Sequence, residues 1–427
     1  MWRENELKSS GEPSNSVMED NNDVSWWTLG GGFDENKNLI DSELNLVFNH
    51  EEILYLGQEE PNPSMVQSTS QQEAKDQILL PLFFEAHSHL FLKGSTLDFA
   101  QRKHEQGLPS NELLDIATTR AQALFQYGIG HLRDGGDNAN VGLTLSSRNL
   151  DRDHAEVASP GSGVNRIKRY GSFFARNLEE FSNPEEVVED RLSRGADHLK
   201  VVVTGIIDFE KGEVKGSPQF DVPTLKPLVD AAHRKGLKVM AHASGEEGVK
   251  TAVLGGVDSI EHGFFMSEEI LSLMKERGTL WVPTFAPVQV QVDEANLMGW
   301  SNISRRNLEA ILLQHRNMLK HAKEIGVGIL PGSDAGSFGV PHGQGFLKEL
   351  TLMEEGGLKA RDLLDLACFA SYKLWFDQEV EWAKGAPSNF QFVSKDALNN
   401  TSVLEHKRQV LIKGETQKMR SDLHSTF

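Results

Sequence analysis

The stretch Asp221-VPTLKPLVDAAHRKGLKVMA-His242 decides the fold. Its first part, residues 222–235, has apolar residues at helical spacing and predicts an amphipathic helix. Gly236 follows, at the position where a left-handed residue commonly ends a helix. The apolar run 237–241 then predicts a buried strand, and a histidine comes directly after it. The order of helix, glycine, strand and polar residue is typical of an α/β protein with parallel strands.

The same order recurs through the central part of the chain. Further helices are predicted at 111–127, 184–194, 245–255, 267–277 and 304–325. The other predicted strands are 79–86, 129–133, 166–174, 198–204, 257–261, 279–284 and 327–330. The strand at 166–174 has the weakest pattern. Eight strands alternating with helices over about 250 residues are typical of a (β/α)8 TIM barrel.

Both ends of the chain have the short apolar runs of β-strands. Near the start these include Leu44–Phe48, and near the end Phe390–Val393 and Gln409–Lys413. The sequence therefore predicts a small β-sandwich from residues 24–78 and 383–415. The distorted barrel, residues 79–382, would be inserted between the two halves of this sandwich.

The first residues, 1–23, are polar and are expected to form a mobile leader. They contain no apolar core of the kind that a secretory signal needs. The longest strongly apolar run, 78–84, is far shorter than the roughly 20 residues of a membrane-spanning helix. A cytoplasmic location is therefore expected.

Charge and cysteine content exclude several classes of function. The 427 residues include 43 Lys and Arg against 62 Asp and Glu, a formal net charge of −19. Such a surface repels phosphate groups, so neither nucleic acid nor an anionic membrane is expected as a partner. The single cysteine, Cys368, excludes an intramolecular disulfide and Cys-rich metal sites, and is expected in the core. Assembly into a homo-oligomer stays open.

Side chains that can bind metal ions stand at or near the ends of five predicted strands. They are His87, His89, Lys200, His242, His262 and Asp334. His87 and His89 are two residues apart, so they point to the same face of their strand. Barrel enzymes build their active sites at the C-terminal ends of the strands. The six residues are therefore expected to converge, and imidazole and carboxylate groups suit zinc.

Five short motifs carry a resemblance to a known family. They are Gly128-Ile-Gly-His-Leu-Arg-Asp134, Gly195-Ala-Asp-His-Leu-Lys-Val201, Ala241-His-Ala-Ser-Gly-Glu246, Asp258-Ser-Ile-Glu-His-Gly263 and Gly332-Ser-Asp-Ala-Gly336. Over roughly residues 25–400 the sequence resembles the amidohydrolase superfamily. Within it, the sequence is most similar to the imidazolonepropionase and Xaa-Pro dipeptidase (prolidase) branch. The resemblance implies a metal-dependent hydrolase on a distorted (β/α)8 barrel with a flanking β-sandwich.

The resemblance also implies a role for each of the six residues. His87 and His89 would bind the more buried of two divalent ions, and His242 and His262 the second. Lys200 would bridge the two ions as a carbamate formed with carbon dioxide. Burial favours the neutral amine of a lysine, which is the form that reacts with carbon dioxide. Asp334 would contact the first ion and act as general base and acid.

The implied reaction is attack by a metal-bridged hydroxide on an amide or lactam C–N bond of a small molecule. An Xaa-Pro dipeptide, an N-acyl amino acid and an imidazolone-like ring are the candidate substrates. Tyr170, His342 and Arg133 are candidate substrate contacts. The alternatives are barrel packing for Tyr170 and a salt bridge with a neighbouring acid for Arg133. The charged loop 208–215 is expected to be solvated, with a lid over the site as the alternative.

One residue departs from the pattern of the family, and two alternative functions stay open. Glu85 stands where the family usually has aspartate, and is expected to support the metal site from behind. A mononuclear-metal deaminase of a small heterocycle is one alternative function. That branch typically has His-x-x-Glu and no bridging lysine, whereas Glu246 is four residues after His242 and Lys200 is present. A catalytically silent scaffold is the other alternative; its mark would be lost ligands, and all six are present.

Overall fold

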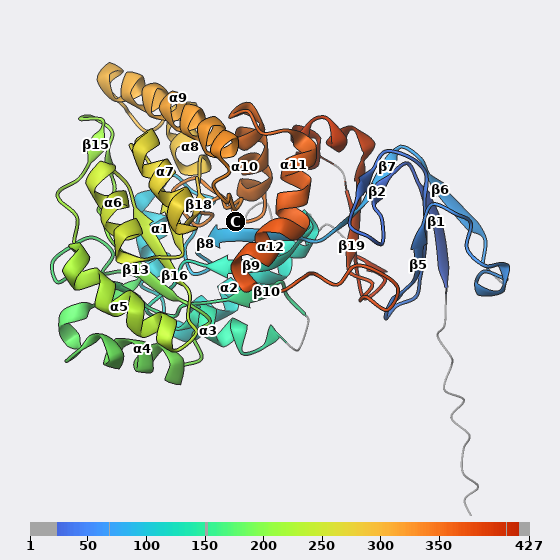
Figure 1. Ribbon diagram of the computed structural model, residues 1–427, viewed down its shortest axis with the longest axis horizontal. Helices are drawn as coiled ribbons and strands as arrows, with labels where there is room; N and C mark the ends of the chain where they lie inside the picture. Colours follow the sequence, from blue (N-terminus) through green and yellow to red (C-terminus); the bar gives the residue numbers. More distant parts are fainter. Residues whose placement is uncertain (1–23, 68, 150–152, 407, 418–427) are drawn as a thin grey trace, which may run out of the picture.

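The computed structural model describes residues 24–417, apart from 68, 150–152 and 407. The leader expected at 1–23 lies outside the described residues. Figure 1 shows a larger part, in which helices surround strands, beside a smaller part built of strands. Strands from both ends of the chain lie together in the smaller part.

Parallel strands form the centre of the larger part. One sheet has the order β10-β9-β8, with bounds Glu156–Ala158, Ile129–Asp134 and Phe83–Ser88. The other has the order β12-β11-β13-β16-β17-β18, with bounds Ala175–Asn177, Gly163–Asn165, Leu199–Val202, Val239–Ala243, Ser259–His262 and Leu280–Val282. The predicted eighth strand is reduced to isolated bridges, Trp281 to Ile329 on one side and Ser88 to Ala335 on the other. The protein is thus an α/β protein with the expected parallel strands.

One predicted strand of the barrel is wrong, and the ring of strands has a gap of the kind that the expected distorted barrel allows. Residues 166–174 form turns, and the nearby strand β11 has already ended at Asn165. In the described residues, the hydrogen-bonded ladder is also interrupted between β10 and β11. The backbone N–H of Ser159 donates to the Asp197 carboxylate at 2.8 Å. The Asp197 side chain thus accepts the hydrogen bond of a backbone N–H that would bond to a neighbouring strand in a continuous ladder.

Helices surround these strands (Figure 1). Their bounds are α1 Phe99–Gln106, α2 Ser110–Leu124, α3 Val141–Ser146, α4 Pro184–Ser193, α5 Val222–Arg234, α6 Glu246–Gly255, α7 Glu268–Arg277, α8 Ala286–Asp293, α9 Asn302–Ile325, α10 Gln344–Glu355, α11 Ala360–Asp365 and α12 Ser371–Phe376. All six predicted helices are confirmed, within a few residues at each end. After α5, Gly236 has a φ of 78°, the left-handed conformation that turns the chain into β16.

The smaller part consists of two sheets. The first has the order β5-β4-β1-β6, with bounds Ile53–Gly57, Leu44–Phe48, Ser25–Leu29 and Gln71–Ala74. The second has the order β21-β20-β19-β7-β2-β3, with bounds Glu415–Thr416, Gln409–Ile412, Phe390–Ser394, Gln77–Pro81, Gly32–Phe33 and Leu39–Ile40. Trp27 packs on Phe392, and Phe48 on Phe390, each with ring centroids 5.0 Å apart. These contacts hold the two sheets face to face, as in a β-sandwich.

The junction between the two parts corrects one predicted strand. Residues 79–86 do not form a single strand, because the chain passes from the sandwich into the barrel within them. β7 pairs with β19, and β8 pairs with β9. Cys368 lies below this junction, buried as expected, with its Sγ 3.9 Å from the carbonyl oxygen of Pro81. The division of the chain into residues 24–78, 79–382 and 383–415 stays a prediction. Its first boundary falls within β7.

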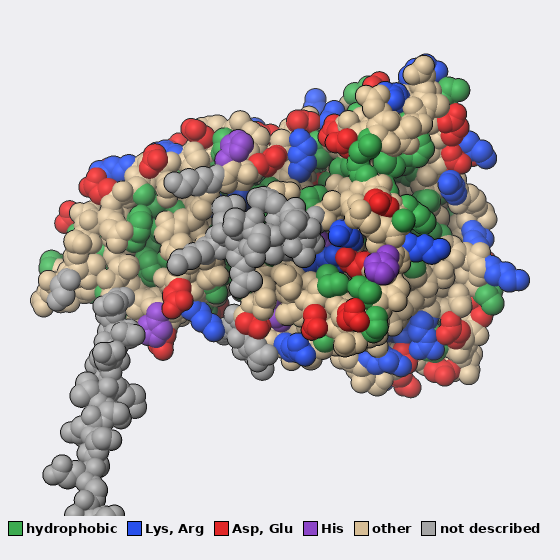
Figure 2. All heavy atoms as spheres, turned by 180° about the vertical axis from the view of Figure 1, so that it is seen from behind, with side chains coloured by type: hydrophobic (Ala, Val, Ile, Leu, Met, Phe, Trp, Pro, Cys, Tyr) green, Lys and Arg blue, Asp and Glu red, His purple; other side chains and the backbone are tan. Residues whose placement is uncertain are grey.

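None of the helices in the described part of the chain is both long enough and apolar enough to cross a bilayer. On the face seen in Figure 2, acidic and basic side chains lie close to one another, with hydrophobic side chains between them. The large negative charge of the sequence is therefore not gathered into one acidic patch on that face.

Candidate metal centre

The six residues singled out in the sequence come together at the C-terminal ends of the parallel strands. They are His87 on β8 and His89 just after it, Lys200 on β13, His242 on β16, His262 on β17, and Asp334 after the eighth-strand segment. All except His87 line one cavity, whose volume is about 230 Å³. His87 lies against this cavity, with its Nε2 3.3 Å from Oδ1 of Asp334.

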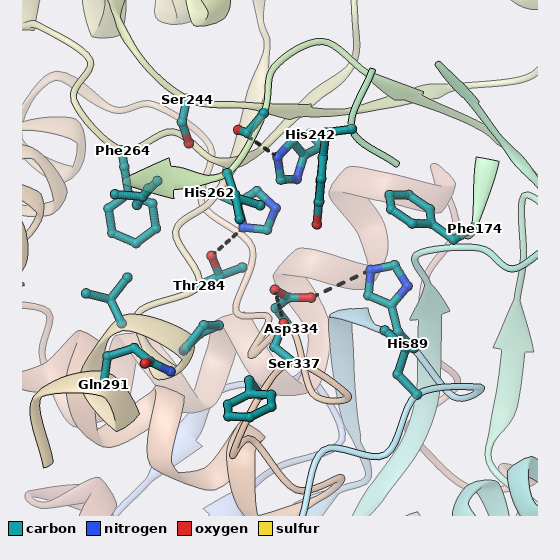
Figure 3. Close-up of a pocket in the computed structure, with 18 of the residues that line it drawn as sticks. His89, Phe174, His242, Ser244, His262, Phe264, Thr284, Gln291, Asp334 and Ser337 are labelled. Carbon is teal, nitrogen blue, oxygen red and sulfur yellow. Dashed lines mark hydrogen bonds and ion pairs between the residues drawn. The ribbon is translucent and has the colours of Figure 1, made fainter. Parts of the chain in front are cut away.

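Asp334 is the centre of this group. Its Oδ1 is also 3.6 Å from Nε2 of His89, and Figure 3 shows it between His89 and His262. One ligand atom each from His87, His262 and Asp334 can be chosen so that all lie within 4.8 Å of one another. Nitrogen and oxygen donors so close together form a candidate site for a metal ion.

Three of the histidine rings are held in place through Nδ1. The contacts are His87 to Oε2 of Glu261 (2.7 Å), His262 to Oγ1 of Thr284 (2.8 Å) and His89 to the carbonyl oxygen of Gly136 (3.3 Å). Each contact leaves Nε2 free, and for His87 and His89 this nitrogen faces Asp334. Contacts of this kind fix the tautomer and orientation of metal-binding histidines.

Burial keeps the histidines neutral. It lowers the pKa of His89 and of His242 to about 3, and that of His262 well below its usual value. His242 differs in orientation, because its Nε2 is 3.4 Å from the carbonyl oxygen of Gly205 and its Nδ1 is left free. A neutral imidazole is the form that binds a metal ion.

The side chain of Lys200 is buried, with 1% of it exposed, and its Nζ has no hydrogen-bond partner among the described residues. Burial lowers the pKa of Lys200 to about 8, although Glu261 and Asp334 act in the opposite direction. An unpaired buried ammonium is costly, so the neutral amine is more accessible than in an exposed lysine. Nε2 of His87 also lacks a hydrogen bond, so two buried nitrogen donors are left without a partner at this candidate metal site.

Asp334 is positioned by its own loop. Oε1 of Glu85 accepts a hydrogen bond from the backbone N–H of Ser333 at 2.7 Å, and the backbone of His87 also stabilises this carboxylate, so the glutamate supports the site from behind. The Ser337 hydroxyl donates to Oδ2 of Asp334 at 2.6 Å. Burial alone would raise the pKa of Asp334, but contacts with His87 and the other histidines hold it below its usual range. The carboxylate therefore stays ionised.

Backbone strain marks the same site. Asp334, His262 and Thr284 all have positive φ values, of 54°, 71° and 51°. Non-glycine residues in this region cost about 1–3 kcal/mol each and concentrate at functional sites. Thr284 was not predicted as a site residue. It is the last residue of the predicted strand 279–284, so the search for polar residues at strand ends that identified the histidines could also have identified Thr284.

Arg133 does not line the cavity and forms a buried salt bridge. It is fully buried, and its Nη2 donates to Oε2 of Glu261 at 2.8 Å while its guanidinium lies 4.0 Å from the Trp375 ring centre. The salt-bridge alternative is therefore confirmed. Burial would raise the pKa of Glu261, but Arg133 and His87 outweigh burial and keep it low. The pair orients His87 from behind.

Substitution of Arg133 by methionine is expected to destabilise the fold by about 3–5 kcal/mol, because Glu261 would be left buried without its cation. Urea unfolding of the metal-free protein measures this loss. Arg234→Met is the matched control, since the Arg234–Glu185 pair, at 2.6 Å, is exposed and contributes little. Equal stability of the two variants would contradict the role given to Arg133.

The other two candidate substrate contacts lie in different places. His342 is buried and does not line the cavity; its Nε2 is 3.1 Å from the carbonyl oxygen of His89. It therefore supports the backbone of His89, and the expected substrate contact is not found. Tyr170 stands on a turn instead of a strand, yet it lines the cavity with its ring 5.4 Å from that of His242. Contact of Tyr170 with a substrate stays a prediction.

Much of the remaining cavity wall is apolar. Its aromatic members are Phe173, Phe174, Phe209, Phe264 and Phe338. The loop expected to be solvated is a hairpin of β14 Ile207–Asp208 and β15 Glu213–Val214, and it adds part of this wall. Asn307 on α9 donates to the carbonyl oxygen of Phe209 at 2.9 Å, which ties the hairpin to the barrel.

Comparison with known proteins identifies the family. The model of the amidohydrolase family matches residues 78–375, and the chain belongs to this family. This range includes all six residues of the candidate centre and the strands that carry them. The family resemblance seen in the sequence is thus confirmed.

Individual relatives are 24–27% identical to this chain in sequence. An uncharacterized protein of Mycobacterium tuberculosis is 27% identical over 341 residues, which cover 79% of this chain and 85% of the relative. Ochratoxinase of Aspergillus niger is 26% identical over 351 residues, covering 75% and 70%. A solved structure of a Xaa-Pro dipeptidase with bound methionine has a TM-score of 0.77 at 24% identity, over 93% of this chain and 100% of that one. This last likeness concerns the fold.

Proposed function

We propose that the protein is a binuclear metal-dependent hydrolase that cleaves an amide or lactam C–N bond of a small molecule. The observation that carries the proposal is the unpaired, buried Nζ of Lys200 in a cavity shared with three neutral histidines and Asp334. Membership of the amidohydrolase family supports it. The name of one similar solved structure, a Xaa-Pro dipeptidase, favours a dipeptide or another amide of an amino acid as substrate.

The proposed metal set has two halves. His87 and His89 would hold the more buried ion, with Asp334 beside it, and His242 and His262 would hold the second. Lys200, as a carbamate formed with carbon dioxide, would lie between the two halves. The donor set suits zinc.

In the proposed reaction, two divalent ions would supply an activated water and polarise the scissile carbonyl. Asp334 would take the proton from the attacking water and deliver it to the leaving nitrogen. Its ionised state and its place beside His87 and His89 suit this task. The apolar wall would exclude bulk water and position the acyl or amino-acid side chain of the substrate.

The deaminase alternative has less support. Its acid and base would be a glutamate close to His242. Glu246 is exposed at the start of α6 and accepts a hydrogen bond from Ser267 at 2.9 Å, and it is not among the residues that line the cavity. The scaffold alternative predicts that no metal is bound.

Metal content and a substrate screen test the proposal together. We expect about two zinc ions per chain after zinc loading, and hydrolysis of at least one dipeptide, N-acyl amino acid or lactam. His262→Ala should lose about one ion, whereas His321→Ala, on the outer helix α9, should keep both. One ion per chain with release of ammonia would favour the deaminase, and no bound ion would favour the scaffold.

A further inference from the structure

The cavity wall contains an arginine without an acidic partner. Arg102, on α1, lines the cavity together with Asp334 and Tyr170, and interacts electrostatically with both. Its Nη1 donates to the carbonyl oxygen of Lys93 at 3.2 Å, and its guanidinium lies 5.8 Å from the ring centre of Phe338. Among the described residues, no carboxylate forms an ion pair with it.

Arg102 is half-buried, whereas three other arginines are fully buried. The three that are fully buried each have a carboxylate partner: Arg120 with Glu105, Arg133 with Glu261 and Arg191 with Asp190. Desolvation of a guanidinium is costly, so a buried arginine normally has such a partner. Like Arg102, the half-buried Arg305 and Arg408 lack a carboxylate partner among the described residues. What distinguishes Arg102 is that it lines the cavity of the candidate metal centre.

The acids nearest to Arg102 in the sequence are engaged elsewhere. Asp98 caps α1, where it accepts a hydrogen bond from the backbone N–H of Ala100 at 2.8 Å. Glu105 binds Arg120 at 2.5 Å, on the side of the helix that faces the interior. Neither of them forms an ion pair with Arg102, although Glu105 and, more strongly, Asp334 in the cavity attract its charge.

We propose that Arg102 binds the carboxylate of the substrate, an inference that rests on the proposed function. Since Nη1 donates to the carbonyl oxygen of Lys93, the edge formed by Nε and Nη2 is left for two oxygens of one planar group. That edge matches a carboxylate, which an arginine binds with two parallel hydrogen bonds. Lys200 is the one other lysine or arginine among the described residues that line the cavity, so a phosphate dianion would have poorer neutralisation.

The apolar wall of the cavity indicates that the substrate also has a hydrophobic group. Phe173 and Ile206 line the cavity and are still 40% and 43% exposed, so they stand at its mouth. Large hydrophobic side chains kept at a cavity mouth favour a hydrophobic ligand. The substrate is therefore an N-acyl amino acid or dipeptide with a free carboxylate and a bulky apolar group.

The test compares an acid with its ester in the metal-free protein, so that binding is measured without turnover. The probes are N-acetyl-L-phenylalanine and its methyl ester, titrated by calorimetry. Arg102→Met should weaken binding of the acid by roughly 10–100-fold and leave binding of the ester within about 2-fold. Arg102→Lys should give an intermediate loss, because it keeps the charge but not the planar fork.

Lys103→Met is the matched control, since Lys103 is exposed on the same helix and does not line the cavity. It removes the same charge and should leave both probes unaffected. Equal binding of acid and ester by the unaltered protein, no binding of the acid, or equal losses for both probes in Arg102→Met would overturn the inference. A screen without hydrolysis, combined with the expected acid–ester difference, would reject the proposed function and leave the Arg102 site standing.

Discussion

Lys200→Ala is expected to lose the metal pair and to reduce hydrolysis by about three orders of magnitude, equivalent to about 4 kcal/mol of transition-state stabilisation. The carbamate of Lys200 would supply the metal pair with both a ligand and a negative charge, and alanine supplies neither. Nζ has no hydrogen bond in the described protein, so the side chain has no polar contact whose loss would account for such an effect. Metal content by mass spectrometry and turnover of the best substrate from the screen measure the two losses.

Rescue by a small acid tests the bridging carbamate directly. A short carboxylic acid such as acetate or propionate would occupy the space left by the side chain and offer two bridging oxygens. It should restore part of the metal content and part of the activity of Lys200→Ala. Lys238→Ala is the matched control, because Lys238 pairs with Asp377 at the surface at 2.8 Å. A Lys200→Ala protein with both ions and full turnover would show that the carbamate assignment is wrong.

Asp334→Asn is expected to keep at least one metal ion and to lower turnover by about 10²–10⁴-fold. An asparagine keeps the size of the side chain and can accept the hydrogen bond from Ser337, but it cannot take up a proton. Steady-state kinetics with parallel metal analysis separate a lost proton transfer from a lost ion. The control is Asp293→Asn, the same substitution at an exposed position of α8. Undiminished turnover of Asp334→Asn would remove Asp334 from proton transfer.

The convergence of the six site residues was predictable because parallel strands end at a common edge. His242 and His262 illustrate this, since β16 and β17 are neighbours and both histidines stand at the ends of their strands. Local patterns are sufficient for such residues: an apolar run defines the strand, and the next polar residue marks its end. The third strand could not be found in this way. β10 and β11 have three residues each, too few for a period, and the apolar residues after them serve the cavity wall.

Long-range pairing decided what the sequence could not reveal. Arg133 and Glu261 are 128 positions apart, and no local pattern links them. The same holds for Arg102, whose unpaired state depends on the bonds that Asp98 and Glu105 make elsewhere. A sequence shows which arginines exist, but the arrangement of their neighbours decides which of them faces a ligand.

The sheet shared by the two ends of the chain has a consequence for biosynthesis. Gln391 on β19 contacts Pro81 on β7 across 310 positions, so β7 leaves the ribosome long before its neighbour exists. At about 5–20 residues per second, the delay is roughly 15–60 s. During that time one edge of β7 is open to pairing with other nascent chains. The yield of active protein should therefore depend on how well this edge avoids such pairing until β19 has been synthesised.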